Sequence, residues 1–395
     1  MRNRAGNVRG RACRGWQGGA LAAGLLAFAL LCGCAGRQAA PLPTPDPAGE
    51  PASAPVPALP KASPETVARP EPTPTPAPTP FSIAWITDTQ TMTMYPSLAP
   101  ALLPTFRWIA QSREEYNTQL LIHTGDFVEN GWNPLHWERI NPAIALLEGE
   151  LPFLPVAGNH DVAKKVLSYE PYLAQPFIAW QAPERQYRGG EGYYERFTAG
   201  GTDFLVLGLG YLSVNEAGLA WAREVFRQND DCVGILAVHS YLSYGSDRTS
   251  ELTGHGALLR QEVVAPCGNV RMVLSGHVKG NALRIESFDD DGDGQAERQV
   301  VCMRHNYQQN RYPDQVGYLR MLIFDPVSRA VSVLTCAPAQ GSFTAAPDRA
   351  DEEHFTIENA FYRPCQPGES GRQRRRPRPG LSAAEGRFPP AGEAL

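Results

Sequence analysis

The middle of the chain carries five short apolar runs, each followed at once by polar residues. These runs are residues 82–86, 120–123, 151–156, 233–238 and 270–274. Each is too short for a helix and apolar enough for a buried strand. Helical patterns lie between them, through Phe106 to Ile109 and over residues 140–147, 216–226 and 258–264. This alternation of strand and helix predicts parallel βαβ units, and therefore an α/β fold.

Antiparallel strands are expected beside and after this alternating region. Residues 193–197 and 204–209 predict a strand pair, and short alternating runs follow at residues 298–303, 318–324 and 331–334. Apolar periodicity fades after about residue 344. The sequence therefore predicts a folded domain over residues 81–343 and a disordered tail over residues 344–395.

The start of the chain has the pattern of an export signal. Five arginines precede residue 15, and an apolar run of about a dozen residues, 20–31, ends in small residues. Because about 20 apolar residues are needed to cross a bilayer, this pattern indicates a secretory signal. The sequence Leu-Cys-Gly-Cys at residues 31–34 resembles the lipobox of bacterial lipoproteins, which implies lipidation of Cys34. We expect residues 1–33 to be removed and the protein to be exported and lipid-anchored to the cell envelope, on its periplasmic or cell-surface side; an uncleaved anchor, or a plain signal with a chance cysteine, is the alternative.

A proline-rich tract separates this signal from the first strand. Fifteen of the forty residues from Pro41 to Pro80 are proline. Such a segment cannot bury a core and favours the extended polyproline II conformation, with about 3.1 Å of rise per residue. We expect residues 34–80 to be a disordered tether that holds the folded domain roughly 100 Å from the lipid anchor.

Composition and charge limit the choice of partners. A hydrophobic content of 43% is sufficient for a sizeable core. The net charge is −5, yet five arginines precede residue 15 and five more lie between Arg372 and Arg378. The segment between these clusters is therefore acidic, and we expect no nucleic-acid binding surface on the folded part.

Five cysteines follow the predicted signal and linker: Cys232, Cys267, Cys302, Cys336 and Cys365. In an exported protein they allow at most two internal disulfides, with one thiol left over. Cys232 and Cys267 each open a strand-like run, so a disulfide between them is reasonable if those strands are neighbours. No Cys-x-x-Cys spacing is present, which argues against zinc-ribbon and thioredoxin-like sites.

Polar side chains follow all five apolar runs. They are Asp88 and Gln90 after the first, Asp126 after the second, Asn159, His160 and Asp161 after the third, and His239 and His277 after the last two. For residues 158–161 taken alone, a turn that caps the next helix is the simpler interpretation. If the five strands form one sheet, however, their carboxyl ends meet at the edge where such sheets bind ligands. Carboxylate, amide and imidazole groups suit Zn²⁺, Mn²⁺ or Fe, so the set predicts a metal site.

In order and spacing, these motifs resemble those of the calcineurin-like metallophosphoesterases. The pattern of that family is D-x-H, G-D, G-N-H-D/E, an isolated His after a strand, and G-H-x-H. This chain has D-T-Q from Asp88, G-D ending at Asp126, G-N-H-D at residues 158–161, His239, and G-H-V-K from Gly276. The resemblance covers residues 81–338 and implies a four-layer α/β/β/α sandwich around two sheets. It also implies hydrolysis of a phosphomonoester or phosphodiester substrate, with one or two divalent metal ions (Mn, Zn or Fe) as cofactors.

The resemblance further implies a role for each matching residue. Asp126 would bridge two metals; Asn159, His239 and His277 would complete the second metal site; Asp88 and Gln90 would serve the first. A metal-bound hydroxide would attack phosphorus in line, while His160, oriented by Asp161, would protonate the leaving oxygen as general acid.

Two departures from the family pattern fall on the first metal. Gln90 replaces a histidine, and its amide oxygen is a neutral and weaker ligand. Lys279 replaces the last histidine of G-H-x-H, and an ammonium has no lone pair for a metal. Three outcomes stay open: the first metal is bound weakly, Lys279 substitutes for its charge and contacts a phosphate oxygen, or catalysis has been lost. The last outcome gives the alternative function, a non-catalytic lipoprotein that binds a phosphorylated ligand or partner.

Three other stretches attract attention for their chemistry. Residues 289–294 resemble the start of an EF-hand loop, but Val300 stands at the twelfth position, where a bidentate Glu is required. An acidic hairpin turn is the simpler interpretation, with weak Ca²⁺ binding as the alternative. Residues 305–308 follow a strand and either line the pocket or form a structural turn. His123 is expected to be packed inside a strand or to support the site from behind.

Overall fold

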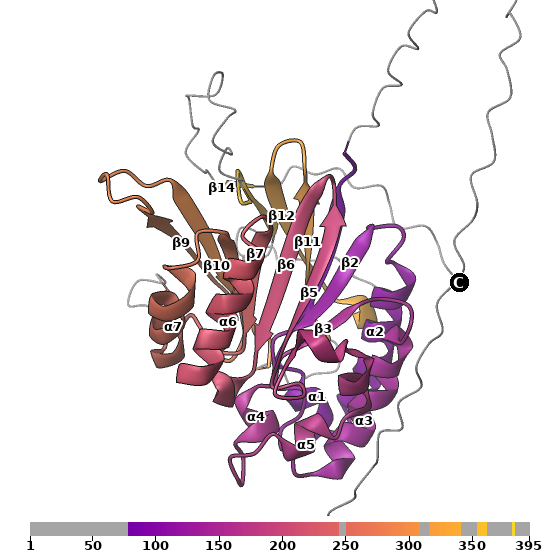
Figure 1. The fold of residues 1–395 in the computed structure, drawn as a ribbon. Helices are drawn as coiled ribbons and strands as arrows, with labels where there is room; N and C mark the ends of the chain where they lie inside the picture. Colours follow the sequence, from indigo (N-terminus) through magenta and orange to yellow (C-terminus); the bar gives the residue numbers. More distant parts are fainter. Residues whose placement is uncertain (1–77, 245–249, 309–315, 341–353, 362–380, 384–395) are drawn as a thin grey trace, which may run out of the picture. The chain divides into compact units, whose positions relative to one another are not determined.

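Two seven-stranded β-sheets lie at the centre of the part of the chain that the computed structural model describes (Figure 1). The described residues are 78–244, 250–308, 316–340, 354–361 and 381–383, the last of these as backbone only. They belong to one compact unit, Thr73–Leu395. The predicted signal peptide, Cys34, most of the predicted linker and Cys365 lie outside the described residues.

The first sheet has the strand order β14-β13-β12-β11-β1-β2-β3. Its parallel strands are β1 (Phe81–Ile86), β2 (Thr118–His123) and β3 (Phe153–Pro155). Its antiparallel strands are β11 (Leu319–Asp325), β12 (Ala330–Cys336), β13 (His354–Ile357) and β14 (Leu381–Ala383). The first three predicted strands therefore lie side by side in one sheet.

The second sheet has the strand order β4-β5-β6-β7-β8-β10-β9. Its parallel strands are β6 (Thr202–Leu209), β7 (Val233–Val238), β8 (Val270–Ser275) and β10 (Arg298–Arg304). Its antiparallel strands are β4 (Gln186–Tyr187), β5 (Gly192–Ala199) and β9 (Ala282–Phe288). The predicted pair at residues 193–197 and 204–209 is confirmed as β5 and β6.

Helices cover the outer face of each sheet (Figure 1). The first sheet is covered by α1 (Gln90–Met94), α2 (Leu102–Gln111), α3 (Pro134–Ile144), α4 (Asn159–Val162) and α5 (Glu170–Leu173), and the second by α6 (Glu216–Gln228), α7 (Gly254–Leu259) and the π-helical η6 (Arg260–Val264). Short 3₁₀ helices are η1 (Ala99–Ala101), η2 (Ala145–Leu147), η3 (Pro176–Trp180), η4 (Pro183–Arg185), η5 (Tyr211–Ser213) and η8 (Pro338–Gln340). Side-chain caps explain where α3, α6 and α7 begin: Asn133 accepts from Leu135 N, Asn215 from Gly218 N, and Thr253 from Gly256 N. Among the described residues, no helix is both long and apolar enough to cross a bilayer.

Alternating side chains create three separate cores. In β1, Ile83 and Trp85 point into the core between the sheets, whereas Ala84 and Ile86 point to the helices of the first sheet. Strand β7 behaves in the same way, with Ile235 in the central core. Because side chains on a strand alternate between its two faces, a strand buried on both faces is apolar throughout. The result is four layers, α/β/β/α, as the sequence predicted.

The predicted disordered tail is wrong over part of its length. Residues 354–357 form β13, which pairs with β12, and Phe355, Ile357 and Phe361 are buried in the central core. The domain therefore extends to at least residue 361 rather than ending at residue 343. Four residues are too few to show an apolar period, which explains why this strand was not predicted.

The proposed disulfide between Cys232 and Cys267 does not form. Strands β7 and β8 are neighbours, as required, but both cysteines are free and buried, as are Cys302 and Cys336. Cys232 Sγ lies 3.6 Å from Asp231 Oδ1, and Cys267 Sγ lies 3.8 Å from Arg223 O. The two thiols therefore have different polar neighbours, and adjacency of the strands was not a sufficient condition.

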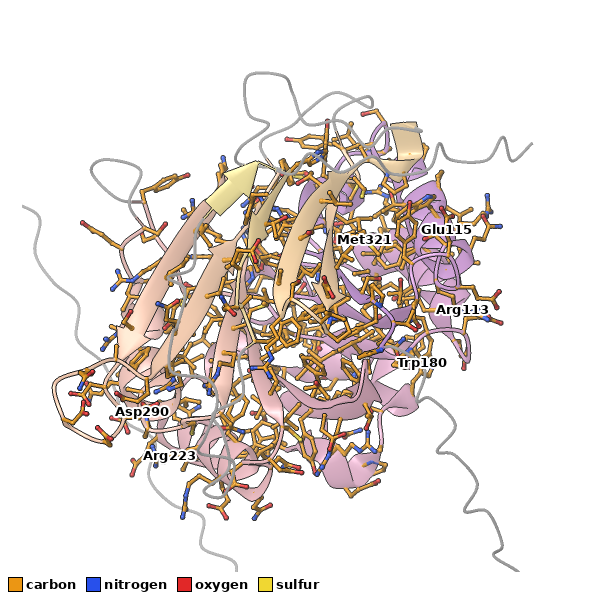
Figure 2. The ribbon with its side chains drawn as sticks, turned by 90° about the horizontal axis from the view of Figure 1, so that it is seen from above. Arg113, Glu115, Trp180, Arg223, Asp290 and Met321 are labelled. Atoms are coloured by element: carbon orange, nitrogen blue, oxygen red, sulfur yellow. The ribbon has the colours of Figure 1, made fainter. Side chains whose placement is uncertain are left out.

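The acidic stretch at residues 289–294 joins β9 to β10 and is a hairpin connection, as predicted. Figure 2 shows Asp290 in a loop that projects outward at the edge of the fold. Carboxylate oxygens of Asp289, Asp291, Asp293 and Glu297 lie within 4.8 Å of one another. Exposed acidic groups often gather in this way without an ion, so Ca²⁺ binding here stays a prediction.

Candidate active site

The loops that follow β1, β2, β3, β7 and β8 meet at one end of the two sheets. Asp88 N donates to Gly125 O over 2.9 Å, and Gly276 N donates to His239 O over 3.0 Å. A third contact crosses between the sheets, where His239 Nδ1 lies 2.8 Å from Thr124 O. The motif residues therefore converge, as predicted, but the assumption that their strands share one sheet is wrong. Two sheets packed face to face bring their carboxyl ends together instead.

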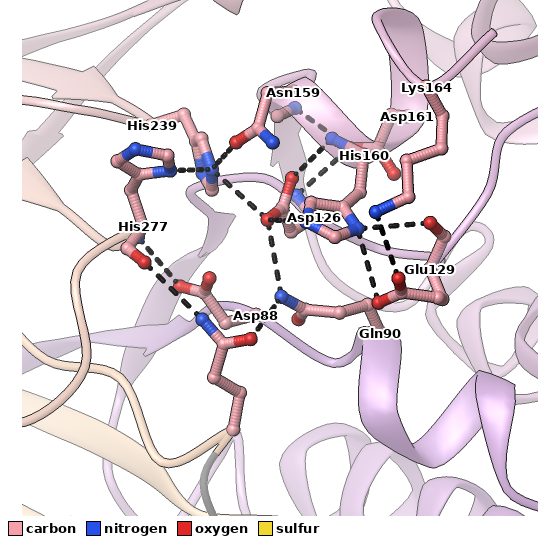
Figure 3. Close-up of polar contacts among 12 residues, drawn as sticks. Asp88, Gln90, Asp126, Glu129, Asn159, His160, Asp161, Lys164, His239 and His277 are labelled. Atoms are coloured by element: carbon pink, nitrogen blue, oxygen red, sulfur yellow. Dashed lines mark hydrogen bonds and ion pairs between the residues drawn. The ribbon is translucent and has the colours of Figure 1, made fainter. Parts of the chain in front are cut away.

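Asp126, Asn159, His239 and His277 form what we call the imidazole side of the site (Figure 3). His239 Nε2 lies 3.0 Å from Asn159 Oδ1 and 3.2 Å from His277 Nδ1. The same nitrogen lies 3.3 Å from Asp126 Oδ2. Ligand atoms placed about 2.0–2.1 Å from a tetrahedral metal are separated from one another by about 3.3 Å. These four groups therefore fit a single divalent cation.

A backbone hydrogen bond determines which nitrogen of His239 faces this position. Thr124 O can only accept, so His239 Nδ1 carries the hydrogen and Nε2 presents a lone pair. A proton competes for that lone pair: burial disfavours the charged imidazole, but Asp126 opposite raises the pKa of His239 to about 9. Burial also opposes ionisation of Asp126, yet the charge of His239 prevails and lowers the pKa of that carboxyl to about 2. A divalent cation would take the place of the proton.

The remaining imidazole on this side is already in the form that binds metals. Burial, together with the charge of His239, lowers the pKa of His277 to about 4. At neutral pH His277 is therefore uncharged, and its lone pair is available. Three site residues also have left-handed backbones, with φ of 53° at Asp88, 56° at Asp126 and 68° at His277. Such conformations are uncommon for residues other than glycine, and they cluster at functional sites.

Two glycines of the motifs are required by close approach of other atoms. A Cβ at Gly158 would lie 2.2 Å from Asp126 N and 2.3 Å from Asp126 Oδ1. A Cβ at Gly276 would lie 2.2 Å from both Asp88 Oδ2 and Thr87 Oγ1. Any other residue at either position would displace the carboxylate it touches. The glycines thus allow the loops to pack directly against Asp126 and Asp88.

Asp161 does not orient His160, contrary to the prediction. Its Oδ2 accepts from Gly158 N over 2.7 Å and from Asp126 N over 2.9 Å, and its Oδ1 accepts from Val128 N over 3.1 Å. Asp161 is the third residue of α4, and a carboxylate there reaches back to the residue before the helix in a capping box. Burial, and then the charge of Asp126, raise the pKa of Asp161 to about 8. Asp161 therefore shapes the turn that carries His160.

The group that orients His160 is Glu129, which sequence reasoning missed. His160 Nδ1 lies 3.1 Å from Glu129 Oε2 and 3.0 Å from Glu129 O, and Lys164 Nζ lies 3.0 Å from Glu129 Oε1 (Figure 3). Burial favours neutral His160, but the hydrogen bond that His160 donates to Glu129 and the charge of Asp126 outweigh it and raise the pKa of His160. The available signal was position, because Glu129 follows Asp126 by three residues in the same loop.

Asp88 and Gln90 lie on the opposite side, which we call the amide side. Asp88 Oδ2 accepts from Thr87 Oγ1 over 2.8 Å and from His277 N over 3.0 Å. Gln90 Nε2 donates to Asp126 Oδ2 over 3.2 Å and to Gln308 Oε1 over 2.7 Å. Lys279 is exposed. Of the stretch at residues 305–308, Gln308 contacts the site through Gln90, while Asn306 Oδ1 accepts from Gln308 N within a structural turn, so both interpretations of this stretch hold in part.

Supporting residues surround both sides. His123 is buried behind the site, as predicted: its Nε2 lies 3.1 Å from Thr89 Oγ1, and its Nδ1 accepts from Gly125 N. The ring of Tyr211 lies 4.6 Å from that of His255 and 6.0 Å from that of His277, measured between centroids. Neither Tyr211 nor His255 belongs to a recognisable motif, so only the fold could place them here.

Comparison with known proteins agrees with this architecture. The family model described as calcineurin-like phosphoesterase matches residues 81–280, just over half of the chain. An uncharacterized protein of Bacillus subtilis, YvnB, is 31% identical over 264 residues, which cover 65% of this chain and 20% of that protein. The chain therefore spans about a fifth of that relative's length.

Solved structures with similar folds include two phosphatases. A purple acid phosphatase from yellow lupin (Lupinus luteus) seeds has a TM-score of 0.47 and 13% identity, over 71% of this chain and 54% of that one. A dimetal phosphatase from Danio rerio has a TM-score of 0.41 and 13% identity, over 64% of this chain and 92% of that one. On the extent of the family match and the motifs within it, the chain belongs to the calcineurin-like phosphoesterase family.

Proposed function

We propose that the protein is a metal-dependent phosphoesterase that hydrolyses a phosphomonoester or phosphodiester outside the cytoplasm. The observation that supports this most strongly is the convergence of Asn159 Oδ1, His277 Nδ1 and Asp126 Oδ2 on His239 Nε2, at 3.0–3.3 Å. A general-acid candidate, His160, stands beside this cluster, with its Nε2 3.9 Å from Asp126 Oδ2.

The chain's own residues have distinct tasks in this reaction. Asp126, Asn159, His239 and His277 hold the cation, which when bound neutralises charge on the phosphoryl oxygens and acidifies the attacking water. Glu129 holds His160 Nδ1, so that Nε2 faces the site. Because the hydrogen bond to Glu129 raises the pKa of His160, a larger fraction of the imidazole is in the acid form, which donates a proton from Nε2 to the leaving oxygen. Asp161 holds the loop backbones while this occurs.

Hydrolysis of generic aryl phosphates tests the proposal. The purified protein is supplied with Mn²⁺ or Zn²⁺ and offered p-nitrophenyl phosphate and bis(p-nitrophenyl) phosphate. We expect turnover of at least one of these esters, lost on chelation of the metal and in Asp126→Ala. Turnover that persists in Asp126→Ala would point to a contaminating enzyme and would reject the assignment.

A non-catalytic binding role is the second candidate, favoured by the departures at Gln90 and Lys279. In that case no ester is hydrolysed with any metal, yet inorganic phosphate binds to the metal-loaded protein. Isothermal titration with phosphate, beside the turnover assay, separates these functions. If the protein binds phosphate but hydrolyses no ester, the non-catalytic binding function is the correct one.

We also propose that Cys34 carries the lipid anchor that places the domain at the cell envelope. The proposal is supported by the basic start, the short apolar run and the Leu-Cys-Gly-Cys sequence at residues 31–34. Mass spectrometry of the native amino-terminal peptide should show a diacylated Cys34, and Cys34→Ser should move the protein from the detergent phase to the aqueous phase. An unmodified peptide that begins upstream of residue 34 would reject lipidation.

A further inference from the structure

A chain of hydrogen bonds fixes the orientation of the Gln90 carboxamide. Gln308 Nε2 donates to His277 O over 3.3 Å, and a backbone carbonyl can only accept. The oxygen of Gln308, Oε1, must therefore face Gln90, and it lies 2.7 Å from Gln90 Nε2. Turning Gln90 over would place two amide oxygens at this short distance, which is repulsive. The orientation of Gln90 is thus set by a backbone carbonyl two contacts away.

The support for this chain comes from the loop after β10. Asn306 is fully buried, and its Nδ2 donates to the same carbonyl, His277 O, over 3.1 Å. Its Oδ1 accepts from Gln308 N over 2.8 Å. Gln308 is therefore tied to His277 both through its own side chain and through Asn306. Asn306 and Gln308, which fix the orientation of Gln90, thus both bind the backbone of His277, a residue of the imidazole side.

The consequence is that Gln90 presents a hydrogen where a ligand of a second ion would present a lone pair. Gln90 Nε2 donates to Asp126 Oδ2 over 3.2 Å, and Asp126 Oδ2 is the oxygen that faces His239 Nε2 at 3.3 Å. A second ion bridged by this oxygen would need an acceptor at the position of Gln90 Nε2. An N–H group and a cation repel each other at that separation. The N–H group of Gln90 therefore lies against Asp126 Oδ2 where a second cation would otherwise bind.

Asp88 and Lys279 do not make up for this loss. Asp88 Oδ2 already accepts from Thr87 Oγ1 and from His277 N, so Asp88 has a single acceptor left, Oδ1, which is buried and has no partner among the described residues. Lys279 is exposed and has no lone pair to offer as an ammonium. We propose that the protein holds one divalent cation, on the imidazole side, and that Gln90, locked by Gln308, takes the place of the second. This inference deepens the proposed function, because it concerns the cation site on which that function rests.

Metal stoichiometry tests the inference without reference to activity. The protein is stripped with chelator, dialysed against Mn²⁺ or Zn²⁺ at micromolar concentration, and its metal content is measured by mass spectrometry. We expect one ion per chain. Two tightly held ions would overturn the inference. The second ion would then bind Asp88 Oδ1 and Gln90 Oε1, which are buried and have no hydrogen-bond partner among the described residues. One ion with no turnover would reject the proposed function and keep the inference.

Two substitutions locate the cause. Gln90→His replaces the N–H donor with a ring nitrogen that can accept, so the stoichiometry should rise to two. Gln308→Leu removes the acceptor that locks Gln90, so a second ion should bind at least about 10-fold more tightly than to the unmodified protein, the scale of residues that orient ligands. Gln228→Leu makes the same chemical change on the exposed face of α6 and should alter nothing. A single ion in a folded Gln90→His protein would show that Gln90 is not what excludes the second.

Discussion

The imidazole side and the amide side of the site share Asp126 but differ in what they offer it. On the imidazole side, Asn159 Oδ1, His277 Nδ1 and Asp126 Oδ2 each lie 3.0–3.3 Å from His239 Nε2. On the amide side, Gln90 turns a hydrogen toward Asp126. On the imidazole side a proton or a cation must lie between the acceptors, whereas on the amide side a neutral N–H group already contacts the carboxylate.

The residue types of a short motif therefore do not determine the chemistry of a site by themselves. A glutamine can accept a metal through its oxygen or replace one through its nitrogen, and its neighbours decide which. Here the deciding neighbour, Gln308, is more than two hundred residues away in the chain, in the loop after β10. Substitutions on either side therefore test whether the two sides differ in metal binding and in their contribution to turnover.

The largest effect is expected from paired substitutions across the site. His277→Ala removes a ligand of the cation, which contributes several kcal/mol to the transition state, so turnover should fall by about 10³-fold and bound metal should be lost. Asp88→Asn keeps the size of the side chain, and it should retain one ion and fall by only about 10-fold. Metal content and turnover of both proteins check this. Equal losses would mean that the two sides contribute alike.

Most of the fold could be predicted from the sequence, because its central strands are buried on both faces. The apolar runs of β1, β7 and β8, the last interrupted by Arg271, predicted strands whose ends carry the motifs, and these strands were confirmed. The sequence did not show how the strands divide between two sheets, since burial on both faces looks the same in one sheet as in two. It also missed β13, which is too short to show a period.

The imidazole side could be predicted in full, whereas its surroundings could not. Asn159, His239 and His277 follow strands in motifs of fixed order. Glu129 and Gln308 have no such motif, and their roles arise from contacts that only the folded chain creates. Asp161 shows the reverse error: its motif suggested a contact with His160, but a carboxylate at the third position of a helix reaches backbone N–H groups more easily.

The next largest effect concerns the proton on His160. Glu129 raises the pKa of His160, so the acid form persists to higher pH, and turnover should fall only as pH rises through this raised value. Glu129→Gln removes the charge; the fall should move to lower pH, and turnover at pH 8 should drop by about 10- to 100-fold. The pH–rate profile measures both.

Lys164→Ala is the matched control, because Lys164 touches Glu129 but not the imidazole. Its profile should shift less than that of Glu129→Gln. An unchanged profile in Glu129→Gln would contradict the role of Glu129, and metal content should be unaffected in both proteins, since neither side chain belongs to the imidazole side.

A smaller effect, on stability, is expected from adding a methyl group where the loop after β3 packs against Asp126. Gly158→Ala places a Cβ against Asp126 N and Asp126 Oδ1, where backbone must move, so the free energy of unfolding should fall by about 1–3 kcal/mol. Gly254→Ala adds the same atom in open space at the start of α7 and should leave stability nearly unchanged. Thermal or urea unfolding of the metal-free proteins compares the two. Equal stabilities would show that the loop after β3 adjusts freely around Asp126.

The smallest effect is expected at Lys279, the exposed residue that departs from the family pattern. Its side chain is exposed, and an exposed charge pair contributes about 1 kcal/mol or less, so contact with a phosphate oxygen would change KM by about 5-fold at most. Lys279→Met keeps the length of the side chain without its charge; we expect KM to rise within that limit, kcat to stay constant and salt to reduce the difference. A large loss of kcat would instead place the Lys279 ammonium against the transition state, and Lys279 would then supply a positive charge to the reaction.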